Sequence, residues 1–267
     1  MPIGAQHQLD RQVSALRHIG AEDIRITYYA GQQNSMRDHF EKPGALSFPV
    51  TWIPENHMEG TGASMINAAL NHASHASVSS VGSPVVIMCA DITGDLAHIL
   101  STLNEHSLIL QEQSKRVDLL MALNQQRWED MGELGSVRLQ GMAPRRDFAG
   151  NESQFRFDTE RFFNQYAGTN MQIVEAVEKP GRAEDALSNI QDMSLYWFGS
   201  RAIFEDGRLI ARDGRGSLDF NSHMLPRMIA TGMGVQGHLF SDRMAHWRHL
   251  HHLGDILQEN MRVLEYA

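Results

Sequence analysis

Two loops of the chain carry side chains that could act as acids, bases or metal ligands. The loop at residues 54–62 contains His57 and Glu59 ahead of a Gly-Thr-Gly run, and the loop at residues 89–95 contains Asp91. Imidazole and carboxylate groups serve as general acids, general bases and ligands of divalent cations. The three residues therefore define a candidate crevice for a hydrolase or transferase, with a bound metal as one option. A plainer alternative stays open, because such residues also begin and cap helices.

A run of histidines near the end of the sequence is a second candidate. His246 and His249 are spaced as two metal ligands on one helix would be. A third ligand at His252 would lie about 120° from the helix face that holds His246, so a complete site on this helix would be strained. His72 and His75 form a similar pair elsewhere. Half-buried histidines at an interface are the alternative, and we assign no metal and no cofactor to the chain.

Two weaker candidates are a cysteine and a basic segment. Cys89 is the only cysteine and ends an apolar run, which is typical of an inert buried thiol. Arg145 and Arg146 lie close to Phe148, a pattern that could stack and neutralise single-stranded nucleic acid. The basic run is short, and the formal net charge of the chain is −9, which opposes nucleic-acid binding. We therefore expect no nucleic-acid partner.

The elements around the first crevice suggest how it would be assembled. Residues 46–53 are predicted to be extended, residues 63–79 to be helical, and the apolar run at 85–89 to be a buried strand. A strand, helix and strand in that order predict a βαβ unit with a parallel pair of strands. Ligands bind beyond the carboxyl ends of such strands, which would bring loops 54–62 and 89–95 together.

The longest periodic segment of the chain extends from Leu96 to Met131. Apolar residues recur alternately four and three positions apart, which predicts one long amphipathic helix with a coiled-coil-like seam, or two helices broken near 104–107. Thr93 would cap this helix. The seam could pack on the chain's own core or on a partner, and we predict an interface formed by Leu96, Leu100, Leu103, Leu110, Val117, Met121, Trp128 and Met131.

The second half of the sequence is predicted to form a separate region. Residues 141–153 resemble a linker, which would divide the chain into an α/β region at 1–140 and an α+β region at 154–267. Short strands with Asp-Gly turns predict an antiparallel meander over 194–220, followed by a terminal helix at 241–264. The predicted fold class is therefore α+β or mixed α/β, helix-rich, with a small and partly parallel N-terminal sheet.

Composition limits the class of protein. The chain has 267 residues with a globular composition, and its apolar runs are far shorter than the ~20 residues of a membrane span. One cysteine and the lack of a secretory signal favour the cytoplasm. Because no catalytic signature is complete, the long seam favours a non-enzymatic structural or assembly component that forms homo-oligomers or binds a protein partner. The alternative is the enzyme whose crevice holds His57, Glu59 and Asp91.

Overall fold

The computed structural model describes most of the chain. The described residues are 2–3, 6–29, 46, 48–55, 59–70, 83–148, 150–210, 216–241 and 247–250. They form five α-helices: α1 (Gln8–His18), α3 (Thr61–Leu70), α4 (Leu96–Glu112), α5 (Glu152–Tyr166) and α6 (Leu225–Ala230). The predicted mixed α/β class is confirmed.

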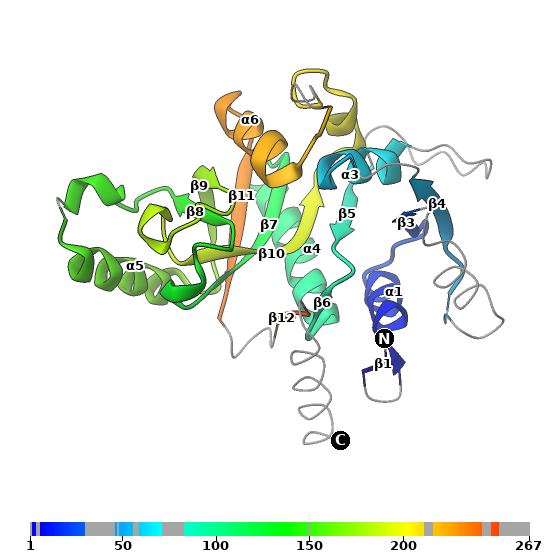
Figure 1. Cartoon of the computed structure of the whole chain (residues 1–267). Helices are drawn as coiled ribbons and strands as arrows, with labels where there is room; N and C mark the ends of the chain where they lie inside the picture. Colours follow the sequence, from blue (N-terminus) through cyan, green and yellow to red (C-terminus); the bar gives the residue numbers. More distant parts are fainter. Residues whose placement is uncertain are drawn as a thin grey trace.

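A six-stranded sheet forms the centre of the molecule (Figure 1). Its strands, in order, are β5 (Val85–Met88), β10 (Ile190–Phe198), β7 (Leu119–Gln125), β11 (Val235–Phe240), β9 (Asn170–Val177) and β8 (Ser136–Leu139). Only β7 and β11 are parallel, and all other neighbours in this sheet are antiparallel.

Three two-stranded ladders accompany the central sheet. They pair β1 (Pro2–Ile3) with β2 (Gln6–His7), β3 (Arg25–Tyr29) with β4 (Thr51–Glu55), and β6 (Ile92–Thr93) with β12 (Arg248–His249). The β3–β4 pair is parallel, whereas the other two pairs are antiparallel. Through β12, the described part nearest the C-terminus lies against the segment that follows β5.

The strand β7 separates two apolar cores, because alternate side chains of a strand point to opposite faces. Leu119, Met121 and Leu123 pack with residues of α3 and α6 on one face. Leu120 and Ala122 pack with residues of α4 and α1 on the other face. A strand that is buried on both faces reads as a continuous apolar run, and β7 has that composition.

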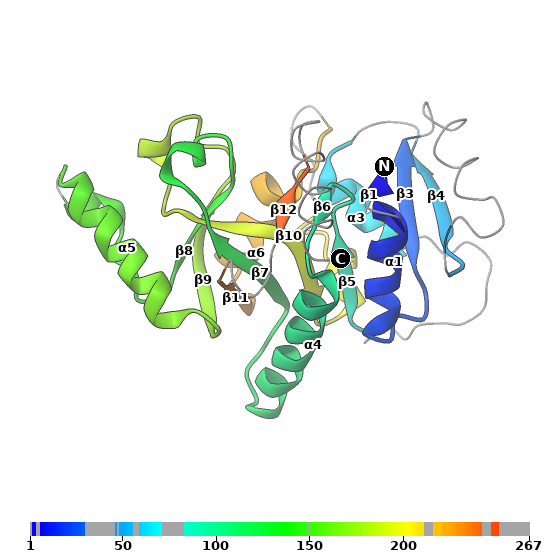
Figure 2. The ribbon, with the colours of Figure 1, turned by 90° about the horizontal axis from the view of Figure 1, so that it is seen from below.

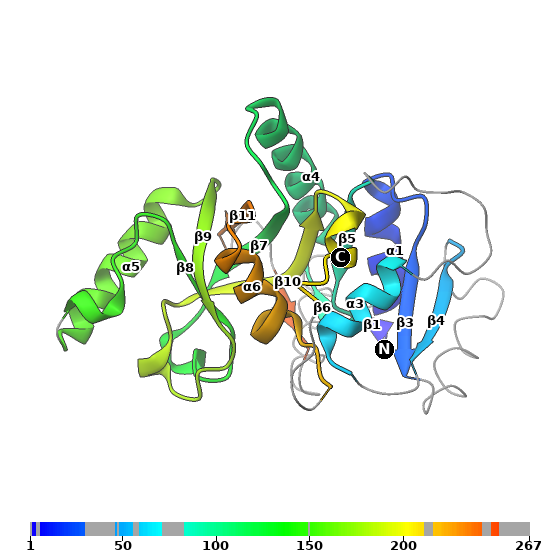
Figure 3. The same ribbon diagram turned by 90° about the horizontal axis from the view of Figure 1, so that it is seen from above.

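The helices and small ladders extend the sheet at both ends. α5 lies beside β8 and β9 at one end of the molecule, and α1, β3 and β4 lie at the other end (Figure 2). α3 and α6 lie on the side of the molecule that Figure 3 shows from above. Both helices contact the helical segment at Phe220–Met224. Among the residues that the structure describes, no helix has the length and apolar character needed to cross a bilayer.

The prediction of one helix from Leu96 to Met131 is wrong, because α4 ends at Glu112. Ser114 has a positive φ of 56°, and its N–H donates to the carbonyl of Gln111. The N–H of Lys115 donates to the carbonyl of Leu110 at 3.0 Å, which closes the helix in the manner of a Schellman motif. The chain then turns back into β7, whose apolar residues had continued the heptad spacing by chance.

The predicted interface seam lies mostly inside the chain. Seven of its eight residues are buried within the three apolar cores, and Val117 is half-buried. The Leu96–Leu110 part packs on the central sheet and α1. The periodic pattern therefore arises from the buried face of α4 followed by the buried strand β7.

Three further predictions about the elements need correction. β4 pairs with β3, and β5 pairs antiparallel with β10, so the βαβ unit with a parallel pair is absent. The predicted meander is instead the long strand β10 followed by a 3₁₀ turn at Arg201–Glu205. Residues 248–249 are the strand β12, and most of the predicted terminal helix lies outside the described residues. The division of the chain at 141–153 stays a prediction.

Candidate functional site

A distorted part of β10 lies opposite the carboxyl end of β5. The N–H of Cys89 donates to the carbonyl of Ser194 at 3.1 Å, and the register of β10 against β7 shifts between Asp192 and Tyr196. Ser194 has a φ of 56°, a conformation that is costly for a residue with a side chain. Such bulges are found where a strand redirects side chains near functional sites.

The carboxylate of Asp192 stabilises this bulge from within. Its Oδ1 accepts hydrogen bonds from the N–H of Ser194 at 2.7 Å and from the hydroxyl of Tyr196 at 2.8 Å. Its Oδ2 accepts a hydrogen bond from the side-chain amide of Asn221 at 3.0 Å. The residue is buried, and three donors compensate for the loss of water around its charge.

Glu178 adds a second carboxyl group to this cluster. A Cβ atom on Gly135 would lie 2.7 Å from Glu178 Oε2 and 3.7 Å from Asp192 Oδ2, so the glycine leaves room for both acids. A cavity of about 10 Å³, the size of one water molecule, lies among Gly135, Glu178, Asp192 and Asn221. Burial, together with the nearby charges of Asp192 and Asp219, raises the pKa of Glu178 to about 7.

Asp219 joins the cluster to the start of α3. Its Oδ2 accepts a hydrogen bond from the hydroxyl of Thr61 at 2.7 Å, and its Oδ1 accepts one from the N–H of Ser222 at 2.8 Å. Burial alone would raise the pKa of Asp219, but these hydrogen bonds outweigh it and the pKa is lowered. Asp219 is therefore ionised at neutral pH.

The Gly-Thr-Gly run at the start of α3 serves close backbone packing. A Cβ on Gly60 would lie 2.5 Å from the carbonyl oxygen of Leu218, and one on Gly62 would lie 2.9 Å from it. That oxygen accepts the N–H of Ala63 at 3.0 Å, and Leu218 donates its own N–H to the carbonyl of Glu59 at 2.7 Å. A backbone carbonyl thus takes the place at this helix start that an anion could have filled.

Cys89 follows β5 opposite the bulge of β10. Burial, followed by the charges of Asp91, Asp192 and Asp219, raises the pKa of its thiol to about 12. The thiol therefore stays protonated at neutral pH and is a poor nucleophile.

Of the residues predicted to line the crevice, the structure describes Asp91 and Glu59. Asp91 follows β5, and its carboxylate lies 3.7 Å from Nδ1 of His249. Glu59 lies at the border formed with Leu218. His57 lies outside the described residues. His246, His72 and His75 lie outside them as well. Among the residues that are described, no three His, Cys, Asp or Glu side chains form a group suited to a metal ion.

Sequence reasoning missed Glu178, Asp192 and Asp219. Asp192 offered one signal, because it is a charged residue inside the otherwise apolar strand β10. Charged residues are seldom fully buried without a partner, so such a position deserves a functional reading. Glu178 and Asp219 lie in loops whose positions depend on the tertiary fold.

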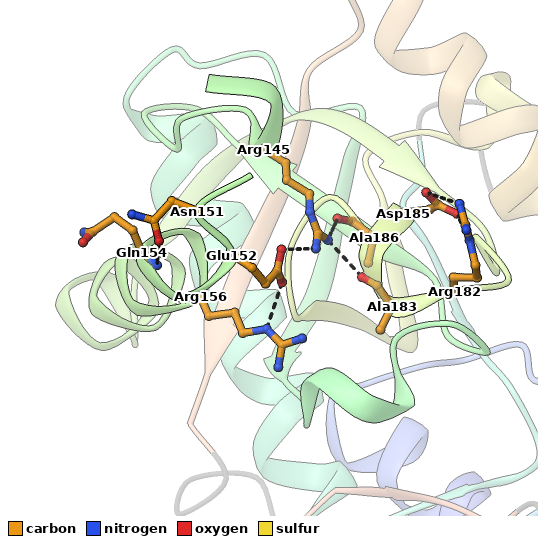
Figure 4. A network of polar contacts seen from close by, with 9 residues as sticks. All are labelled: Arg145, Asn151, Glu152, Gln154, Arg156, Arg182, Ala183, Asp185 and Ala186. Carbon is orange, nitrogen blue, oxygen red and sulfur yellow. Dashed lines mark hydrogen bonds and ion pairs between the residues drawn. The ribbon is translucent and has the colours of Figure 1, made fainter. Parts of the chain in front are cut away.

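Arg145, from the basic segment that suggested nucleic-acid binding, makes its polar contacts within the chain (Figure 4). Arg145 donates to the carbonyls of Ala183 and Ala186 and forms an ion pair with Glu152. Arg156 pairs with the same carboxylate at 2.8 Å. These contacts tie α5 to the segment that precedes β10.

Comparisons with known proteins identify the fold. No protein-family model matches the chain, and no curated protein matches it in sequence. A structure of UDP-glucose pyrophosphorylase complexed with UDP-glucose matches with a TM-score of 0.68 at 14% identity, covering 100% of this chain and 90% of that one. UDP-glucose pyrophosphorylase from Acinetobacter baumannii matches with a TM-score of 0.67 at 12% identity, covering 98% and 84%. HddC from Yersinia pseudotuberculosis matches with a TM-score of 0.60 at 16% identity, covering 98% and 88%.

This chain therefore has the fold of the UDP-glucose pyrophosphorylases over essentially its whole length. The interpretation as a non-enzymatic assembly component with a coiled-coil-like interface is corrected, because the fold is shared with enzymes and the seam is buried. Of the two functional readings of the sequence, the shared fold agrees better with the alternative, a hydrolase or transferase.

Proposed function

We propose that the protein is a nucleotidyltransferase that joins a nucleoside triphosphate to a sugar phosphate and releases pyrophosphate. UTP and UDP-glucose are the nucleotides to test first, because similar structures contain them. The observation that carries the proposal is the match of the whole chain to UDP-glucose pyrophosphorylases. Fold alone does not fix a function, so the site must support it separately.

The positions of the carboxylates are the second support. Asp91 follows the carboxyl end of β5, and Asp219 accepts a hydrogen bond from Thr61 at the start of α3. The charges of both residues raise the pKa of the Cys89 thiol, which supports the proposal that they serve one site. A crevice with acids from separate segments is a common form of active site in α/β proteins.

The charge of this cluster decides how a nucleotide would bind. Carboxylates repel phosphates, so a triphosphate would enter as its complex with a divalent cation. Mg²⁺ is commonly held by one or two carboxylates together with the phosphates of the substrate. Asp91 and Asp219 fit that role as carboxylates, and a ready-made protein cage is not required.

The reaction itself needs positioning and charge compensation. A phosphate oxygen of the sugar phosphate attacks the α-phosphorus of the triphosphate, and the bond from that phosphorus to the bridging oxygen of pyrophosphate breaks. A divalent cation held by Asp91 and Asp219 would compensate the negative charge that develops on the leaving group. Lys179, next to Glu178 in sequence, is an exposed cation at the edge of the cluster.

The test is to incubate the full chain with UTP, glucose 1-phosphate and Mg²⁺, and to measure UDP-glucose and pyrophosphate together. The proposal requires equal amounts of both products. Phosphate release from UTP without the sugar phosphate would indicate a hydrolase instead. A panel of other triphosphates and sugar phosphates extends the test to substrates that the fold does not specify.

We also propose that the protein self-associates and that it is located in the cytoplasm. Self-association can be measured by light scattering at micromolar concentration. A cytoplasmic location can be measured by fractionation of cells.

A further inference from the structure

The segment that carries Asp91 is held from two sides. From one side, the side-chain amide of Gln12 in α1 donates to the carbonyls of Ala90 at 3.2 Å and Ile92 at 3.1 Å. From the other side, β12 pairs with β6, and the N–H of Leu250 donates to the carbonyl of Asp91 at 2.7 Å. Both sets of contacts fix the backbone of the segment.

His249 reaches the side chains of the site. Its Nε2 lies 3.3 Å from Oγ of Ser194 in a hydrogen bond, and its Nδ1 lies 3.7 Å from Oδ2 of Asp91. The ring of Trp247 packs edge-on against the imidazole at 4.7 Å between ring centroids, which helps to fix the orientation of the imidazole. One ring thereby links the loop after β5 to the bulge of β10.

Asp91 is the most exposed of the acids named for the site. Its side chain is 50% exposed, so a contact with a firmly held neighbour can add to what fixes the direction of its carboxylate. The side chain of His249 is only 15% exposed, so the ring is held firmly by its surroundings. A fixed ring beside a half-exposed carboxylate can select one rotamer of that carboxylate.

We propose that His249 is a positioning residue, which fixes the direction of the Asp91 carboxylate and couples it to Ser194. The strand β12 thereby completes the site from the C-terminal part of the chain. This inference rests on the proposed nucleotidyl transfer for its effect on catalysis. The effect of His249 on the Asp91 segment can be measured without it.

The kinetic experiment compares three variants of the full chain. His249→Ala removes both contacts, and we expect the KM for UTP to rise about tenfold, as is usual when the partner of a ligand residue is removed. His249→Gln keeps an amide that can reach one of the two side chains, so we expect it to recover most of that loss. Arg248→Ala is the matched control on the same strand, because its side chain is exposed, and its KM should match the wild-type value.

A second measurement is independent of turnover. Hydrogen exchange of the peptide that spans residues 89–95 should be faster in His249→Ala than in Arg248→Ala, and close to wild type in His249→Gln. Equal exchange in the alanine variants, or an unchanged KM in His249→Ala, overturns the positioning role. If the wild type forms no nucleotide sugar from any pair of substrates in the panel, the proposed function fails, while the exchange data still decide whether His249 holds the Asp91 segment.

Discussion

The hydroxyl group of Thr61 donates a hydrogen bond to Oδ2 of Asp219 at 2.7 Å, although the two residues are 158 positions apart in sequence. The same hydroxyl oxygen accepts the N–H of Phe220 at 3.0 Å. The start of α3 is thus joined to the segment at 217–220, which crosses it. This pair of contacts fixes one border of the candidate crevice.

Replacing Thr61 by valine should destabilise the protein. The change preserves the shape of the side chain but removes the donor to Asp219 and the acceptor for Phe220, which should lower the free energy of unfolding by about 1–2 kcal/mol. Thr61→Ser keeps the hydroxyl and should cost less than about half of that amount. Urea denaturation measures both values, and equal losses in the two variants would contradict the role of the hydroxyl.

Gly60 should be less tolerant of alanine than a glycine of similar backbone conformation. Its φ is +101°, and an added Cβ would meet the carbonyl of Leu218 at 2.5 Å. Gly20 has a φ of +87° with open space around it, so Gly20→Ala isolates the backbone strain. We expect about 1 kcal/mol for Gly20→Ala and at least about 2 kcal/mol more for Gly60→Ala. If Gly20→Ala and Gly60→Ala lowered the free energy of unfolding by similar amounts, the segment at 217–220 would have to move aside at little cost, which would contradict the prediction.

Glu178 should make the protein less stable as the pH rises. Its pKa is about 7 in the folded protein and 4.5 as the unperturbed value, so the folded state binds the proton more tightly. The stability associated with this group is therefore complete below about pH 4.5 and is lost as the pH rises through 7. Thermal unfolding of wild type and Glu178→Gln between pH 5 and about pH 8 measures this. The variant should gain relative stability towards high pH, and a constant difference would refute the assignment.

His238 should have the opposite dependence on pH. Its ring packs 4.3 Å from that of His106 between β11 and α4, and its Nδ1 hydrogen bonds with Asn170 at 2.7 Å. Burial, followed by the charges of His106 and His98, lowers the pKa of His238 to about 3. The unfolded chain therefore binds the proton more tightly, and stability is lost as the pH falls from about 6.5 towards 3. His238→Gln should flatten that loss in acid denaturation experiments, whereas an unchanged acid limb would exclude His238 as its source.

The sequence predicted the parts of the fold that depend on local signals. The start of α4 was predicted to within two residues: Thr93 was expected to cap the helix but belongs to β6, and the cap is Asp95, whose Oδ1 accepts the N–H of His98. Asp91 was found because it directly follows an apolar run. The second half of the long helix was misread because β7 is buried on both faces, so its residues show no period of two and fit a heptad equally well.

The rest of the site depends on tertiary pairing. Glu178 follows β9 and Asp192 belongs to β10. These strands are not neighbours in the sheet, yet both residues line the small cavity with Gly135 and Asn221. The close packing of the segment at 217–220 against the start of α3 could not be predicted from the Gly-Thr-Gly run. Such a run fits an anion-binding site and a close backbone crossing equally well.

The most direct test compares two aspartates of the same region in the pyrophosphate assay with UTP and glucose 1-phosphate. Asp91→Asn removes the charge that the account places at the crevice, and should lower kcat/KM by about a hundredfold, or about 2.7 kcal/mol. Asp95→Asn is the control, because asparagine caps helices as well as aspartate does, and it should retain wild-type activity. Absence of pyrophosphate release by the wild type, or equal activity of the two variants, would contradict a nucleotidyltransferase site at Asp91.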